Sequence, residues 1–151
     1  MRVKVKTVVD QDVQKQYSTL PVQFEFYVVS YLNDPDGWSK KGYFFEPVHV
    51  NQDVTIHLSS QSTLDKQCGL GGKLSCAELN GKTVWLNADR WYHGASKSKL
   101  ELDDYRQYMV SHEIGHTLGY DHTGCPCKNC PAPIMMQQTK GIGHCKPNTK
   151  V

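Results

Sequence analysis

Three histidines in the second half of the chain follow a spacing that suits metal binding. Residues 112–122 read His-Glu-Ile-Gly-His-Thr-Leu-Gly-Tyr-Asp-His, which is the pattern H-E-x-x-H-x-x-G-x-x-H. His112 and His116 are four residues apart, so on a helix their side chains lie on one face and converge on a single ion. Gly119 suits the left-handed conformation that ends a helix, and the chain then returns with His122 as a third ligand.

Glu113 adds a carboxylate beside these imidazoles. It is offset from His112 by about 100° around the helix axis, so it reaches a water bound to the ion without being a ligand. Three protein ligands leave a tetrahedral zinc ion with one open position, which is typical of a catalytic site. With 7 His and 12 Gly in 151 residues, a chance match has a probability on the order of 10⁻⁵ to 10⁻⁴. We therefore prefer a metal site to histidines on a solvated helix face.

The motif resembles that of the metzincin clan of zinc metallopeptidases, in which a methionine-containing turn (the Met-turn) follows beneath the metal. Residues 133–136, Pro-Ile-Met-Met, are the candidate turn, and Met135 is preferred because it follows an apolar residue, as the clan's methionine does. The likeness narrows to a family of metzincin-like proteins of unknown function, known chiefly from actinobacteria. Besides the zinc motif, it rests on residues 87–91, 105–108 and 132–139.

The resemblance implies an α+β fold with a twisted, mostly parallel sheet of about four to five strands. A backing helix and an active-site helix would accompany this sheet. The 151 residues suit a single metzincin-like domain. Residues 1–122 would form its N-terminal subdomain, and residues 123–151 a short, irregular C-terminal subdomain that carries the Met-turn. That subdomain leaves no obvious room for the clan's usual C-terminal helix.

Hydrophobic patterning predicts the elements that position the motif. Strands are expected at residues 3–9, 43–50, 54–59 and 83–88. A helix with a broad apolar face is expected from Pro21 to about Asn33. The motif helix begins near Asp103 or Asp104, either of which suits its N-cap. The polar residues 11–18 and the Gly- and Ser-rich residues 60–82 are expected to be loops.

The strand at residues 84–88 has two interpretations. It is either the upper rim of a cleft, where a peptide adds to a free edge through backbone hydrogen bonds, or a buried central strand. The patterning of these residues alone does not decide between the two.

The chemistry expected from this motif is the hydrolysis of a peptide bond. Zinc lowers the pKa of its bound water to about 7, and Glu113 would act as general base before delivering the proton to the leaving amine. Met135 would form an apolar floor under the histidines. Some metzincins use a tyrosine after the Met-turn as an oxyanion donor, but residues 137–138 are Gln-Gln. Tyr120 and His144 are the candidate substitutes.

The six cysteines have two interpretations. As disulfides they would pair as Cys68 with Cys76, Cys125 with Cys145, and Cys127 with Cys130. The longest bridge would close a loop of about 20 residues around Met135, worth roughly 3 kcal/mol. Alternatively, the last four cysteines would bind a second, structural zinc beside the one catalytic zinc. So many cysteines favour an extracellular or other oxidising compartment, although the first residues form a strand pattern and not a signal peptide.

Composition limits the partners of the chain. The formal charge is +2 without a basic block, so no nucleic acid is expected, and no apolar run reaches the length of a membrane span. We expect a monomer that acts on a peptide or protein substrate as a zinc metalloendopeptidase. The alternatives are a non-catalytic, zinc-stabilised structural or binding module of a virion or surface, and a zinc amidase acting on cell-wall peptides. Glu113 argues against the first alternative, because a purely structural site has no use for that carboxylate.

Overall fold

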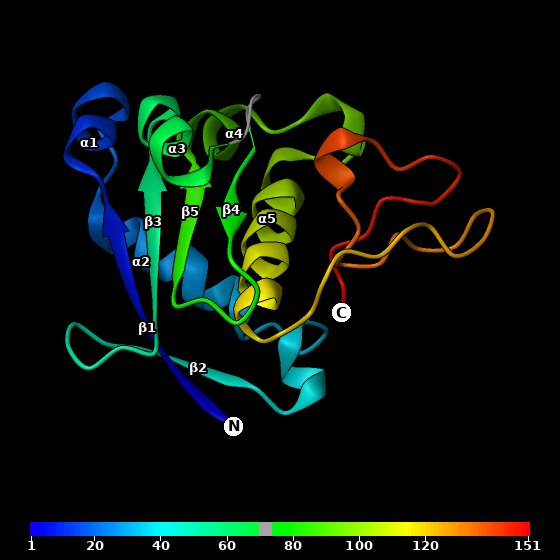
Figure 1. Cartoon of the computed structure of the whole chain (residues 1–151), viewed down its shortest axis with the longest axis horizontal. Helices are drawn as coiled ribbons and strands as arrows, with labels where there is room; N and C mark the ends of the chain where they lie inside the picture. The colour runs from blue at the N-terminus through cyan, green and yellow to red at the C-terminus, as the bar shows by residue number, and fades with distance from the viewer. Residues whose placement is uncertain (70–73) are drawn as a thin grey trace.

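The computed structural model describes residues 1–69 and 74–151, which fold around a five-stranded sheet (Figure 1). The strands are β1 (Arg2–Val9), β2 (Phe44–Pro47), β3 (Val54–Ser59), β4 (Cys76–Ala77) and β5 (Thr83–Asn87). Their order across the sheet is β2-β1-β3-β5-β4, and only β4 is antiparallel to its neighbour. The predicted α+β fold with a mostly parallel sheet is therefore confirmed.

The helices pack against the sheet or lie at its ends. They are α1 (Gln11–Tyr17), α2 (Pro21–Leu32), α3 (Gln61–Cys68), α4 (Ala88–His93) and α5 (Leu102–Thr117). The 3₁₀ turns of the described residues are η1 (Trp38–Lys41), η2 (Ser96–Ser98) and η3 (Gln138–Lys140). The two long helices, α2 and α5, match the two predicted from patterning. Glu101 is the N-cap residue of α5, so the prediction that Asp103 or Asp104 caps this helix is wrong. Both carboxylates lie instead in its first turn, where the helix dipole favours negative charge.

Two of the predicted loops contain helices. The prediction of a loop at residues 11–18 is wrong, because residues 11–17 form α1. The predicted loop at residues 60–82 contains α3 and the short strand β4, and residues 70–73 of that stretch lie outside the described part of the chain. Each of these helices buries a single side chain, Val13 in α1 and Leu64 in α3, and one apolar residue makes no periodic pattern.

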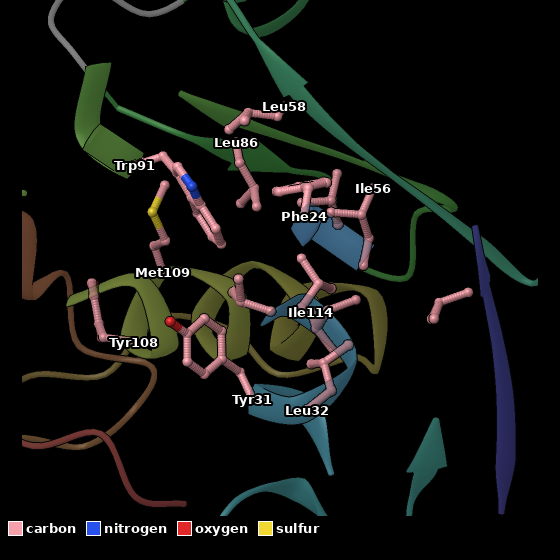
Figure 2. Close-up of a cluster of buried hydrophobic side chains, with 14 of the residues drawn as sticks. Phe24, Tyr31, Leu32, Ile56, Leu58, Leu86, Trp91, Tyr108, Met109 and Ile114 are labelled. Carbon is pink, nitrogen blue, oxygen red and sulfur yellow. The ribbon is translucent and has the colours of Figure 1, made fainter. Parts of the chain in front are cut away.

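The hydrophobic core lies between one face of the sheet and the two long helices (Figure 2). Apolar residues on neighbouring strands stand in register, as Leu58 and Leu86 do on β3 and β5, so they line the same face. Phe24 of α2 and Ile114 of α5 pack against this face, and Trp91 of α4 meets the Phe24 ring edge-on at 5.1 Å between centroids. The core thereby fixes the position of α5 relative to the sheet.

The buried face of α2 is narrower than predicted. Its buried residues are Phe24, Val28, Tyr31 and Leu32. Val22 and Phe26 are apolar residues of the same predicted helix, but they are 71% and 70% exposed. A helix packed against a sheet buries a stripe on one side only, and these two residues lie outside that stripe.

After α5 the chain continues as an irregular segment, residues 118–151, in which η3 is the only helical turn. In Figure 1 this segment, in orange and red, lies beside α5 on the side away from the sheet. The buried side chain of Gln138 holds it together, because its Nε2 donates to the Asn148 carbonyl at 2.9 Å and its Oε1 accepts from the Asn148 N–H at 3.2 Å. None of the helices in the described ranges has the length and apolar character that crossing a membrane requires.

All six cysteines form disulfides. The bonds join Cys68 to Cys76, Cys125 to Cys145 and Cys127 to Cys130, as the disulfide interpretation predicts. The last four cysteines are therefore disulfide sulfurs here and not the thiolates that a structural zinc would need. Three disulfides are consistent with an oxidising or extracellular environment.

Candidate metal centre

Helix α5 places three residues of the motif at the bottom of a cleft. His112, Glu113 and His116 lie on its last turns with exposed fractions of 6%, 5% and 6%. The helix ends at Thr117, and Gly119 then adopts a positive φ of 98°. This turn reverses the chain, as predicted for a glycine at that position, and it brings the exposed His122 back toward the helix.

The three imidazoles converge on one point. The ligand atoms of His112, His116 and His122 all lie within 4.8 Å of one another. Nε2 of His116 and Nε2 of His122 lie 3.0 Å apart. Two ring nitrogens this close repel each other if both present lone pairs, unless they share a cation or a proton. The cluster could therefore hold a metal ion.

Backbone carbonyls orient two of these rings. Nδ1 of His112 lies 2.8 Å from the Ile134 carbonyl oxygen, and Nδ1 of His116 lies 2.9 Å from that of Tyr120. A carbonyl only accepts, so each Nδ1 carries the proton and each Nε2 keeps its lone pair for an ion. Such a hydrogen bond behind a ligating histidine is a usual feature of metal centres. The donor set thus fits a divalent ion that prefers imidazole.

Burial sets the protonation of the site. It lowers the pKa of His112 to about 4, and burial with the neighbouring His116 also lowers the pKa of His122. Both imidazoles are therefore neutral at pH 7, which is the form that binds metals. Burial raises the pKa of Glu113 to about 8, and its Oε1 lies 3.9 Å from His116 Nε2. A cation among the histidines would favour the charged carboxylate and lower this pKa again.

Met135 packs directly against α5 beside the histidines. It is 5% exposed, and its carbonyl oxygen accepts a hydrogen bond from the Thr123 N–H at 3.1 Å. A Cβ placed on Gly115 would overlap the Met135 sulfur and lie 2.8 Å from Trp38 Cζ2. Gly115 thus allows the methionine to approach the helix between the two histidines. Sequence reasoning missed this role, although a glycine inside a helix is a signal of close packing.

The short strand β4 forms the rim of the cleft. The pocket has a volume of about 130 Å³ and is lined by the three histidines, Glu113, residues 74–77 on the rim, and residues of α5 and the C-terminal segment. The prediction of a free edge on the strand at residues 84–88 is wrong, because β5 pairs with β3 on one side and β4 on the other. The central-strand interpretation is correct, and β4 takes the edge.

Neither predicted substitute for an oxyanion donor lines this cleft. The Tyr120 ring packs on Trp38 at 4.8 Å between centroids, and the His144 carbonyl accepts from the Asn129 N–H in the C-terminal segment. Gln137 does line the cleft, and its side-chain amide makes no hydrogen bond to any residue in the described ranges.

The chain is similar to a curated protein and matches a protein family. The chain is 29% identical over 151 residues to "Zinc metalloproteinase-disintegrin-like BfMP" from Bungarus fasciatus. That alignment covers 89% of this chain but only 24% of the relative, so the chain spans about a quarter of the length of that protein. A family described as "Protein of unknown function (DUF3152)" matches residues 3–148. Because this match covers nearly the whole chain, the protein belongs to the DUF3152 family.

Proposed function

We propose that the protein is a zinc-dependent metalloendopeptidase. The observation that carries the proposal is the convergence of three imidazoles within 4.8 Å beside the buried Glu113, at the bottom of a cleft. Three histidine ligands suit zinc and leave one coordination position for water or substrate. The similarity to a protein named as a zinc metalloproteinase supports the same metal and the same class of reaction.

The proposed mechanism assigns the proton transfers to Glu113. Zinc bound by His112, His116 and His122 would supply an activated water and polarise the scissile carbonyl. Glu113 accepts the proton of the attacking water and returns it to the leaving amine. Its carboxylate lies close enough to His116 to reach a water in the same cleft, and it is not needed as a ligand. Met135, which packs against Gly115 of the same helix, would form an apolar floor beneath the rings.

The rim strand suggests how a substrate is held. β4 is the edge of the sheet and borders the cleft, so an extended peptide can pair with its outer backbone groups. Gln137 also lines the cleft, and among the described residues its side-chain amide has no hydrogen-bond partner. We assign it to the carbonyl oxygen of the scissile bond, where a donor stabilises the charge that develops in the transition state.

A digest of a proteome-derived peptide library tests this proposal. The parent protein loaded with zinc is compared with Glu113→Ala, and Glu25→Ala on α2 serves as the matched control for loss of a carboxylate. We expect cleavage by the parent and the control, and none by Glu113→Ala despite full zinc content. Equal cleavage by Glu113→Ala would show the mechanism to be wrong. A zinc-loaded parent that cleaves nothing would favour a non-catalytic module.

A further inference from the structure

A second pocket lies apart from the metal centre. It has a volume of about 260 Å³ and is formed where α2, α4 and α5 meet the segment that follows α1. None of the residues that line it also lines the metal cleft. Its size is close to the lower end of the range for small-molecule sites, so it suits a ligand about as large as one aromatic amino acid.

Arg106 supplies a cation to this pocket. Its Nε donates to the Trp91 carbonyl oxygen at 2.6 Å, and its guanidinium carbon lies 4.9 Å from the Trp91 ring centre and 5.8 Å from that of Tyr92. These contacts fix the guanidinium and use only one of its three nitrogens. No carboxylate in the described ranges forms an ion pair with it, and Asp103, one turn earlier on α5, accepts a hydrogen bond from Tyr31. A half-buried cation without a counter-ion, facing a hollow, favours an anionic ligand.

The remaining walls are flat and aromatic with polar groups at their edges. The rings of Tyr17 and Tyr92 stack at 4.3 Å between centroids with an angle of 11°. The hydroxyls of Tyr92 and Thr19 are hydrogen-bonded to each other, and Gln23 adds an amide. Tyr27, which is 41% exposed, borders the opening. Such walls accept a planar ring and leave the charged group of the ligand to the guanidinium.

We propose that this pocket binds the carboxylate of an aromatic acid, with the two terminal nitrogens of Arg106 as a fork on the carboxylate and the ligand ring against the tyrosines. A planar fork matches a carboxylate with two parallel hydrogen bonds, which a single ammonium group cannot do. The same chemistry is offered by a free aromatic acid and by the aromatic C-terminal residue of a peptide. The pocket is independent of the proposed peptidase activity.

Titration followed by NMR tests the proposal on the full chain. The probes are N-acetylphenylalanine, its neutral amide N-acetylphenylalaninamide, and phenylacetate. The indole N–H signal of Trp91 should move with N-acetylphenylalanine, while those of Trp38 and Trp85 stay in place because neither lines the pocket. The amide should bind about tenfold more weakly, since it lacks the charge that pairs with Arg106. Tighter binding of phenylacetate would indicate a free acid, and tighter binding of N-acetylphenylalanine a peptide C-terminus.

Substitutions separate recognition by Arg106 from other effects. Arg106→Gln should weaken binding of the acid about tenfold, and Arg106→Lys should weaken it less, because lysine keeps the charge but not the fork. Lys97→Gln, an exposed change on η2 outside the pocket, should change nothing. If Arg106→Gln does not fold, the test is the ratio of acid affinity to amide affinity in Arg106→Lys, which should be smaller than in the parent. Equal binding of acid and amide, unchanged binding in the Arg106 variants, or no shift of Trp91 up to about 10 mM acid would each overturn the proposal.

Discussion

The candidate metal centre is built from two regions that are stabilised in different ways. Up to Thr117 the described residues are layered, with a sheet and two long helices around one hydrophobic core, and they hold His112 and His116 almost fully buried. Residues 118–151 have no such layers and present His122 at the surface. In the first region apolar packing sets side-chain positions, whereas the second relies on two disulfides, backbone hydrogen bonds and the Gln138 side chain, and packs Ile134 and Met135 onto the core of the first.

The difference teaches that the two regions form the centre only together. The carbonyl oxygens of Ile134 and Tyr120, both in the C-terminal segment, orient the two buried histidines of α5. In return, α5 offers Gly115 as the surface on which Met135 packs. A segment too short for a core of its own is thus made rigid by cross-links, as in small disulfide-rich domains. Substitutions in either region should therefore lower zinc affinity to a similar extent, but they should change the free energy of unfolding by different amounts.

Replacing a histidine of each region should have the largest effect. We expect His112→Ala and His122→Ala each to lower zinc affinity about a thousandfold, because each removes one of three ligands. Only His112→Ala should also destabilise the metal-free protein, since it leaves a cavity and an unpaired Ile134 carbonyl, whereas His122 is exposed. Competition with a chelator gives the affinity, and thermal unfolding in chelator gives the stability. Stoichiometric zinc retained by either variant would contradict the ligand assignment.

Removing a disulfide of the C-terminal segment should have the second-largest effect on stability and zinc affinity. The double variant Cys125→Ser/Cys145→Ser removes a bond between residues 20 positions apart in the sequence. We expect its free energy of unfolding to fall by roughly 3 kcal/mol and its affinity for zinc to weaken. The matched control is Cys68→Ser/Cys76→Ser, with a separation of 8, which should cost less and leave zinc affinity nearly unchanged. Denaturant unfolding and zinc titration measure both quantities. A parent protein with two zinc ions and reactive thiols would instead support the structural zinc interpretation.

The features predicted best from the sequence are those that produce a regular pattern of side chains. The helix from Pro21, the strands at the centre of the sheet and the histidine spacing all carry a periodic or positional signal that the structure reproduces. The helices α1 and α3 were missed because each buries a single residue, and β4 because two residues are too few for alternation. β4 is nonetheless the rim of the cleft, so an element that borders the candidate site carried too weak a signal to be predicted.

Part of the candidate metal centre cannot be read from side-chain identities. The groups that orient His112 and His116 are backbone carbonyls, and any residue at positions 134 and 120 supplies one. Their placement follows from the tertiary path of the C-terminal segment, which patterning does not reveal. The motif therefore predicted the three histidines, while the reason for their ring orientation required the fold.

A side chain added between the two regions tests how closely they must fit. In Gly115→Ala the new methyl would meet Met135 and Trp38, so we expect a cost of about 2 kcal/mol in unfolding free energy despite the better helix propensity of alanine. Gly124→Ala is the matched control in the C-terminal segment, because no atom lies within 4 Å of its added Cβ. It should change stability by less than about 0.5 kcal/mol. Equal stability of the two variants would show that Met135 does not need its close approach to α5.

The smallest expected effect is a pH dependence of the free energy of unfolding that arises from Glu113 in the layered region. In the metal-free protein its folded-state pKa is about 8 against an ordinary value of 4.5, so the folded state binds the extra proton between these values and loses stability as pH rises through them. His112 acts in the opposite direction, because its folded-state pKa is about 4 against 6.5, and it favours folding as pH rises toward 6.5.

Between pH 6.5 and 8, of Glu113 and His112 only Glu113 still changes its protonation between the folded and unfolded states. The free energy of unfolding of the parent should therefore fall by about 1 kcal/mol per pH unit. Glu113→Gln cannot ionise there and should show no such slope, while it keeps the shape of the buried side chain. Unfolding of both proteins in chelator across this window measures the difference. A parallel decline in the two proteins would assign the slope to other groups and would remove the argument that Glu113 is held in a desolvated site. Added zinc should flatten the slope of the parent, because a cation among the histidines stabilises the carboxylate.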